Sequence, residues 1–257
     1  MFVRFIITLR QKDIMELSGK TALITGSAIR LGWAISLALA EKGCNLILHY
    51  HSSVDDVHEL LEQVSKKNIS AILIKADLTD ENESFSLFSK ILESVHHVDI
   101  LVNNAGIYLD GNALQTTKDI WDKQFMLNLR TPFILSQEFA RQLPEGLPGR
   151  ILNISDAKVL RPKPDHFAYR LTKSSMNEMT KMLSKELAPN ITVNAIAPGL
   201  ILPLAGREAI PLQNRTVSRI PLQRLGGLET VAMNAIHILK QDFMTGQIIT
   251  LDGGEFL

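Results

Sequence analysis

Short apolar runs alternate with helical patterns along nearly the whole chain, and this alternation is the feature that most restricts the fold. Seven runs have the length of a strand and are apolar at almost every position, which is typical of strands covered on both faces. Six longer segments repeat apolar residues at helical spacing. Strands and helices in alternation predict βαβ units, and therefore a parallel, doubly wound α/β sheet of the Rossmann type.

The boundaries of these segments follow from the apolar periodicity and the capping residues. The predicted strands are Thr21–Thr25, Asn45–Tyr50, Ala71–Lys75, Asp99–Val102, Arg150–Ile154, Thr192–Ala195 and Gln247–Leu251. The predicted helices are Leu31–Lys42, Val54–Lys67, Glu81–Val95, Trp121–Arg141, Phe167–Leu187 and Leu228–Lys240. Asp80 and Thr117 are expected to cap helices, and Gly43 is expected to end the first helix.

The chain is predicted to form a single domain around this sheet. Its 257 residues contain no repeat, low-complexity tract or Pro/Gly-rich linker, and doubly wound sheets often reach this length undivided. The 27 basic and 27 acidic residues cancel, so net charge gives no reason to expect nucleic acid or an anionic membrane as partner. Cys44 is the only cysteine, which excludes an intrachain disulfide and a cysteine-rich metal site. We therefore expect a small-molecule partner, no metal and a reducing, cytoplasmic compartment.

The first 18 residues are interpreted as a flexible leader, with the domain covering residues 19–257. Their apolar patch, Phe5–Leu9, is interrupted by Arg4 and Arg10, and it is too short for a membrane span or a signal peptide. Met15 immediately precedes the expected domain, and the sequence leaves open whether translation begins there or at Met1.

The segment TGSAIRLG, residues 25–32, lies where the first strand turns into the first helix. Gly26 and Gly32 allow a tight turn, and the helix N-terminus presents free N–H groups to a pyrophosphate. With Arg30 and Leu31, they are predicted to contact a dinucleotide cofactor. The spacing differs from G-x-G-x-x-G, so on its own the segment fits turn and packing glycines equally well.

The end of the second strand predicts which dinucleotide is bound. NAD sites place a carboxylate there for the ribose hydroxyl, whereas His49, Tyr50, His51, Ser52 and Ser53 offer donors and no carboxylate. Arg30 adds a guanidinium suited to phosphate. The pattern favours NADP(H). A metal site at the two histidines lacks a third ligand nearby, and two half-exposed strand-end histidines remain a simpler alternative.

Tyr169 and Lys173 are four residues apart in a predicted helix and therefore share one face. An ammonium beside a phenol lowers the pKa of the phenol, which predicts a proton donor usable near neutrality. Alone, the pair fits a surface tyrosine with a lysine neighbour equally well.

Taken together, these motifs resemble the short-chain dehydrogenase/reductase family from about residue 19 to the end. The further motifs are NNAG at 103–106, Asn128, Pro198–Gly199 and LDGG at 251–254. The resemblance implies a seven-stranded parallel sheet of order 3-2-1-4-5-6-7 and a homotetramer. It makes Tyr169 the proton donor, lets Lys173 and Tyr169 contact the nicotinamide ribose, and gives Asn128 a water of the proton relay. It further implies a cofactor site lined by Asp77, Leu78, Asn104, Ala105, Gly106, Pro198 and Gly199.

Two positions depart from the main pattern of that family. Arg30 replaces the middle glycine of the turn, and Asp156 replaces the serine expected thirteen residues before the tyrosine. With HYHSS after the second strand, these changes resemble the pteridine reductase and dihydromonapterin reductase branch. There the arginine serves the cofactor phosphates and the pterin, and an aromatic, here Tyr108, stacks the pterin against nicotinamide. Ser52 stands where trypanosomatid members carry an arginine, which implies a softer NADPH preference.

The chemistry of the substitution agrees with a pterin substrate. A serine suffices for a carbonyl oxygen that becomes an alkoxide, whereas a pterin presents a C=N bond among N–H donors, for which the carboxylate of Asp156 is the better acceptor. Arg30, Tyr108, Asp156 and Tyr169 are therefore the predicted substrate contacts. A carbonyl reductase, such as a 3-oxoacyl-carrier-protein reductase, and a non-catalytic NADP(H) sensor remain as alternatives.

Several other residues are expected to be structural or peripheral. Met176, Met179 and Met182 should pack a helix interface, and Cys44 should be an inert core thiol. Residues 198–226, with little periodicity, are interpreted as a substrate loop or lid. Arg161, Lys163 and His166 lie close to the site in sequence; they are assigned to a solvated loop, with contact to the substrate as the alternative.

Overall fold

The computed structural model describes residues 15–203 and 217–257 and contains one seven-stranded parallel sheet of order β3-β2-β1-β4-β5-β6-β7. The strands are β1 (Thr21–Ile24), β2 (Asn45–Tyr50), β3 (Ala71–Lys75), β4 (Ile100–Asn103), β5 (Gly149–Ile154), β6 (Ile191–Pro198) and β7 (Ile248–Leu251). The fold class and the strand order predicted above are confirmed.

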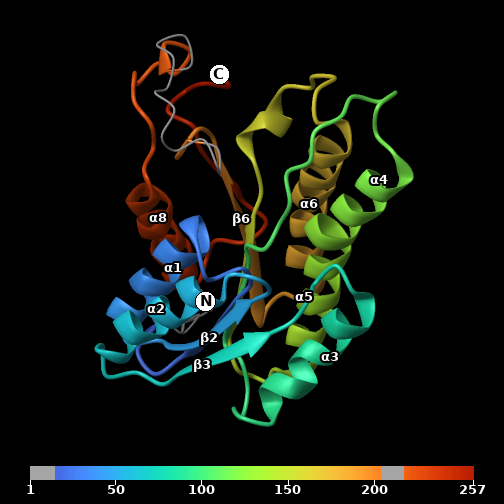
Figure 1. The fold of residues 1–257 in the computed structure, drawn as a ribbon. Helices are drawn as coiled ribbons and strands as arrows, with labels where there is room; N and C mark the ends of the chain where they lie inside the picture. Colours follow the sequence, from blue (N-terminus) through green and yellow to red (C-terminus); the bar gives the residue numbers. More distant parts are fainter. Residues whose placement is uncertain (1–14, 204–216) are drawn as a thin grey trace, which may run out of the picture.

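Helices cover both faces of this sheet (Figure 1). One layer holds α1 (Arg30–Glu41), α2 (Val54–Ser65) and α8 (Leu228–Lys240). The other holds α3 (Glu81–Leu92), α4 (Lys118–Phe125), α5 (Thr131–Gln142) and α6 (Phe167–Glu186). Asp80 and Thr117 accept N–H bonds at the starts of α3 and α4, as expected of helix caps.

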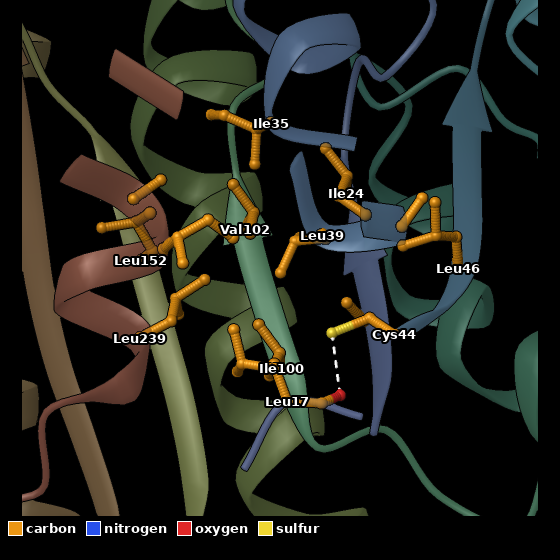
Figure 2. Packing of buried hydrophobic residues seen from close by; sticks show 14 of the residues in the cluster. Leu17, Ile24, Ile35, Leu39, Cys44, Leu46, Ile100, Val102, Leu152 and Leu239 are labelled. Carbon is orange, nitrogen blue, oxygen red and sulfur yellow. Dashed lines mark hydrogen bonds between the residues drawn. The ribbon is translucent and has the colours of Figure 1, made fainter. Parts of the chain in front are cut away.

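Each strand contributes side chains to two cores because successive residues point to opposite faces. Ile100 and Val102 lie in the core under α1 and α8, while Leu101 between them lies in the core under α3 and α5. Figure 2 shows the first of these cores, where Ile24, Leu39 and Leu152 converge. Burial on both faces explains why the strand segments are apolar at nearly every position.

The core begins before residue 19. Met15 and Leu17 are 5% and 2% exposed, and the Met15 N–H donates to the Lys240 carbonyl. The Cys44 thiol donates to the Leu17 carbonyl at 3.1 Å (Figure 2), and burial raises the pKa of Cys44 to about 12. The thiol is therefore inert, as predicted, and the last residues of the predicted leader belong to the packed chain. The rest of that leader, residues 1–14, lies outside the described residues.

The predicted helix Trp121–Arg141 is wrong in one respect, because the structure divides it. α4 ends at Phe125, a π-helical turn, η1, covers Met126–Arg130, and α5 begins at Thr131. Hydrophobic periodicity does not distinguish these turns, since a single wide turn shifts the apolar face only locally. Asn128, one of the predicted site residues, lies in the middle of this π-helical turn.

Candidate active site

The candidate site lies at the carboxyl edge of the sheet, where the strand order reverses between β1 and β4. Parallel pairing brings the ends of β1, β4, β5 and β6 to one edge, and open α/β sheets bind ligands at such a switch point. The segments that follow these strands carry the predicted site residues.

The turn after β1 is built for close approach of backbone. Gly26 has a φ of +61°, and a Cβ added there would lie 3.1 Å from the Ala105 Cα. A Cβ added at Gly32 would lie 2.1 Å from the Gly26 carbonyl oxygen. Neither position accepts a side chain, and α1 begins between them, so the turn has the shape of a phosphate cradle at a helix N-terminus.

The NNAG loop after β4 is fixed to this turn by Thr25. The Thr25 hydroxyl accepts from the N–H groups of Asn104 and Ala105, both at 2.9 Å. The Asn104 side-chain amide donates to the Thr25 and Gly26 carbonyls at 2.8 and 2.9 Å. These four hydrogen bonds therefore fix the two loops to each other at the edge of the candidate site.

His49 does not have the predicted role. It is 2% exposed, its Nδ1 accepts from the Gly26 N–H at 3.0 Å, and its Nε2 pairs with the Ala76 carbonyl at 3.1 Å. Both ring nitrogens are thus used inside the protein, and none remains for a 2′-phosphate. His49 is a neutral strut behind the glycine turn, and burial lowers its pKa to about 4.

The exposed donors at the end of β2 are the residues that follow His49. Tyr50 and Ser53 are partly buried, and His51 and Ser52 are exposed. The His51 Nε2 lies 3.7 Å from an Asp77 carboxylate oxygen, while Ser53 precedes α2 without a side-chain capping bond. Leu78 is 2% exposed, so its side chain belongs to the core.

Arg30 has an unusual backbone. Its φ is +54°, a left-handed value that favours glycine and costs a larger residue about 1–2 kcal/mol. Its guanidinium donates to the Pro203 carbonyl at 2.8 Å, which joins the turn to the segment after β6. Arg30 is therefore placed between the glycine turn and the start of the predicted substrate loop; residues 204–216 of that loop lie outside the described residues.

Tyr169 and Asp156 form a direct pair. The phenol donates to Asp156 Oδ2 at 2.8 Å, and Asp156 Oδ1 accepts from the Lys158 N–H at 2.7 Å. Burial and the adjacent carboxylate raise the pKa of Tyr169 well above its ordinary value. The pKa of Tyr169 therefore lies above its ordinary value, whereas the sequence predicted a value lowered by Lys173.

Lys173 and Asn128 lie behind the tyrosine and are almost fully buried. Lys173 donates to the Ile154 carbonyl at 2.7 Å, and burial lowers its pKa to about 8. The Asn128 side chain makes two 2.9 Å bonds to the main chain of Ile107. A Cβ added at Gly106 would lie 3.1 Å from Asn128 Oδ1 and 3.8 Å from Lys173 Nζ, so this glycine keeps the space above both groups open.

Tyr108 is held against the tyrosine by aromatic contacts. Its ring stacks on His166 at 4.1 Å and meets Tyr169 edge-on at 4.6 Å. His166 was assigned to a solvated loop, yet it is the residue directly before α6, with a left-handed φ of +47°, and its ring is partly buried against Tyr108. Lys158, two residues after Asp156, was not recognised in the sequence, and its ammonium donates to the Tyr108 hydroxyl at 3.0 Å.

The last two motifs meet at the end of β6. Pro198 pairs with Leu251 in the sheet, the Gly199 N–H donates to the Leu251 carbonyl at 2.9 Å, and a Cβ on Gly199 would lie 2.7 Å from Asp252. Pro198 and Gly199 therefore pack directly against the LDGG segment, residues 251–254, at the edge of the site. Among the described residues no cluster of three metal-binding side chains occurs, and no described helix has the length and hydropathy of a membrane span.

Comparisons with known proteins place this geometry in a family. A family model described as enoyl-(acyl carrier protein) reductase matches residues 26–255. A 3-oxoacyl-[acyl-carrier-protein] reductase of Staphylococcus epidermidis is 31% identical over 243 residues, covering 93% of this chain and 99% of that protein. The chain belongs to the short-chain dehydrogenase/reductase family of oxidoreductases, which confirms the resemblance found in the sequence.

Solved structures agree with this assignment. An alternative dihydrofolate reductase 1 from Brucella canis, complexed with NADP, superposes with a TM-score of 0.88 at 32% identity, covering 94% of this chain and 95% of that one. A short-chain dehydrogenase from Burkholderia cenocepacia, in complex with NADP, gives a TM-score of 0.85 at 28% identity, covering 95% and 100%.

His49 gives the first testable prediction. An ordinary histidine takes up a proton near pH 6.5 when unfolded, whereas here it does so near 4, so lowering the pH between these values favours the unfolded chain. Between pH 7 and 5 this group alone should remove about 2 kcal/mol from the free energy of unfolding. His49→Gln should lose that part of the dependence in urea unfolding, while exposed His51→Gln should keep it. An unchanged pH dependence in His49→Gln would contradict the conclusion that His49 is buried in its neutral form.

Proposed function

We propose that this protein is an NADPH-dependent reductase that acts on the C=N bond of a pterin of the dihydropterin or dihydrofolate type. The observation that carries the proposal is the 2.8 Å bond between Tyr169 and Asp156, because it places a carboxylate where a carbonyl reductase needs only a hydroxyl. The similarity to the Brucella canis alternative dihydrofolate reductase supports it.

The residues at the sheet edge fit NADP(H). The glycine turn and Asn104–Gly106 would hold the pyrophosphate and nicotinamide ends, together with Pro198 and Gly199. Asp77 and the main chain at Leu78 would line the adenine. The 2′-phosphate would face His51, Ser52 and Ser53. These residues supply hydrogen-bond donors at the end of β2, whereas both ring nitrogens of His49 are used inside the protein. When bound, NADPH supplies a hydride to the carbon of the C=N bond.

Tyr169 supplies the proton that the nitrogen of that bond needs. Because its pKa is raised, the phenol stays protonated at neutral pH and has one proton to donate. Asp156, held by the Lys158 N–H, accepts from the N–H and amino groups of a pterin and aligns its C=N bond with the phenol. The positive charge of Lys173, 5% exposed, stabilises the tyrosinate left after the transfer.

Asn128 completes the proton path. Its side chain is engaged by Ile107, so a water at this position would be bound through the main chain of the π-helical turn. Single π-helical turns inside α-helices occur frequently at functional sites, which supports this role. The tyrosinate would then recover its proton through Lys173 and that water.

The alternative is a carbonyl reductase, which the Staphylococcus epidermidis relative favours. It would use the same hydride geometry on a ketone, with Asp156 as a substitute for serine. The third candidate is a sensor without catalysis, and it gives no reason for burying Lys173 and Asn128 behind a proton donor. Between the two enzymatic candidates, the pterin is favoured over the ketone by Asp156, Arg30 and Tyr108.

Cofactor preference is the first test of this proposal. We expect a higher kcat/KM with NADPH than with NADH, and we expect Arg30→Gly to weaken that preference or pterin binding about tenfold. Arg141→Gly, which removes an exposed arginine at the end of α5, is the control. Steady-state rates with both cofactors check this, and equal kcat/KM values in the unaltered protein would refute the preference.

Asp156 is the second test. Asp156→Ser should lower dihydropterin turnover about ten- to a hundredfold, because a hydroxyl does not replace an anionic acceptor. Turnover of an activated ketone should fall far less. Asp156→Asn keeps the shape of the side chain and removes its negative charge, and Tyr169→Phe should impair both substrates. If Asp156→Ser left pterin turnover intact, or raised both activities equally, the pterin assignment would fall.

Assembly is the third test, because the family resemblance implies a homotetramer. A groove between α4, η1, α5 and α6 exposes Phe133 and Met182, 44% and 70% exposed, and we propose that it pairs with a second copy about a two-fold axis. Met176 is buried within the subunit, as expected of helix packing. Light scattering should give four chains, and Met182→Glu should give fewer, while Phe85→Glu on α3 should change nothing. A monomer at micromolar concentration contradicts the proposal.

A further inference from the structure

Lys158 contacts both Asp156 and Tyr108, two of the predicted substrate-binding residues. It lies on a short 3-10 turn, Ala157–Leu160, directly after Asp156. Its main-chain N–H donates to Asp156 Oδ1 at 2.7 Å, and its ammonium donates to the Tyr108 hydroxyl at 3.0 Å. One residue therefore fixes the carboxylate through its backbone and the aromatic ring through its side chain.

The main chain of Lys158 is itself anchored. Its carbonyl accepts from the guanidinium of Arg170, which is 8% exposed and paired with Asp165. Because the backbone is held at both its N–H and its carbonyl, the ammonium starts from a fixed position. Across residues 15–203 and 217–257, no carboxylate forms a salt bridge with it. Its bond to the Tyr108 hydroxyl is the one hydrogen bond that its side chain makes within these ranges, and the ammonium also lies over the Tyr108 ring, 4.6 Å from its centroid.

The hydroxyl end of Tyr108 needs such an anchor. His166 stacks on one side of the ring and Tyr169 meets it edge-on, but these contacts do not fix the direction of the hydroxyl. A hydrogen bond from a charged donor is directional and stronger than a neutral one. Lys158 therefore sets the angle and distance of the Tyr108 ring relative to the Asp156–Tyr169 pair.

We propose that Lys158 is a positioning residue that makes the site selective for flat heteroaromatic substrates. This inference rests on the proposed function. A flat ring must stack on Tyr108 while its edge meets Asp156 and Tyr169, so it needs both surfaces at one fixed separation. A small ketone needs only the acid pair. The loss of the Lys158 ammonium should consequently weaken the binding of flat substrates and leave small ketones unaffected.

Kinetics with a dihydropterin and a small activated ketone test the selectivity. Lys158→Met keeps the aliphatic stem and removes the charge. We expect the KM for the dihydropterin to rise about five- to tenfold, with kcat and the ketone kcat/KM changed less than twofold. Lys158→Arg should restore most of the affinity, and Lys163→Met, which removes an exposed cation of the same loop, should have no effect.

A double-mutant cycle separates action through Tyr108 from general damage. In a Tyr108→Phe background, which lacks the accepting hydroxyl, Lys158→Met should add less than a twofold change in KM. Full additivity would overturn the proposal. An equal loss of ketone and pterin activity in Lys158→Met would overturn it as well, since that result indicates a structural defect.

Spectroscopy makes this failure distinguishable from a failure of the proposed function. The chain has three tyrosines, so NMR of protein labelled at the tyrosine ζ-carbon gives three signals, with that of Tyr108 assigned by its loss in Tyr108→Phe. Lys158→Met should shift that signal and leave Tyr50 in place. An unmoved Tyr108 signal overturns the Lys158 contact alone. Absence of pterin turnover in the unaltered protein, with the signal shifted as expected, overturns the proposed function and with it the selectivity.

Discussion

The parallel register of the central strands is the constraint on which the site depends. β4 and β5 pair so that Asn103 lies opposite Asn153, and the Asn103 side-chain amide donates to the Asn153 side-chain Oδ1 at 2.9 Å. The Asn153 amide donates in turn to the Thr180 hydroxyl on α6 at 2.9 Å. These groups are buried, where broken hydrogen bonds are costly. The chain of amides therefore fixes α6, and with it Tyr169 and Lys173, over the ends of the strands.

A carboxylate beside the proton donor changes the electrostatics of this site. Burial and Asp156 both favour the protonated phenol of Tyr169 and raise its pKa well above the ordinary value. Burial also lowers the pKa of Lys173 to about 8, so its charge begins to fall just above neutral pH. The site thus holds its proton firmly, and under the proposed function the N–H groups of a pterin would compete for Asp156. A ketone brings no such donors.

The fold could be predicted because apolar alternation and the order of the motifs are properties of consecutive residues. Strands such as Asn45–Tyr50 and Ala71–Lys75 have their predicted bounds. The role of His49 could not be predicted, since its partners at Gly26 and Ala76 are 23 and 27 residues away. The raised pKa of Tyr169 depends on the same kind of long-range geometry, and a pattern that sees Lys173 four residues away counts only the cation.

Relative rates with two substrate classes test the central claim, that the Asp156–Tyr169 pair is built for a C=N bond. The measurement is NADPH oxidation by the purified protein with dihydromonapterin, dihydrobiopterin, dihydrofolate and an acetoacetyl thioester, compared as kcat/KM. The account predicts that at least one of the three pterin substrates exceeds the thioester by about tenfold or more, a difference of about 1.4 kcal/mol in transition-state stabilisation. A thioester turned over faster than every pterin would contradict it and identify a carbonyl reductase.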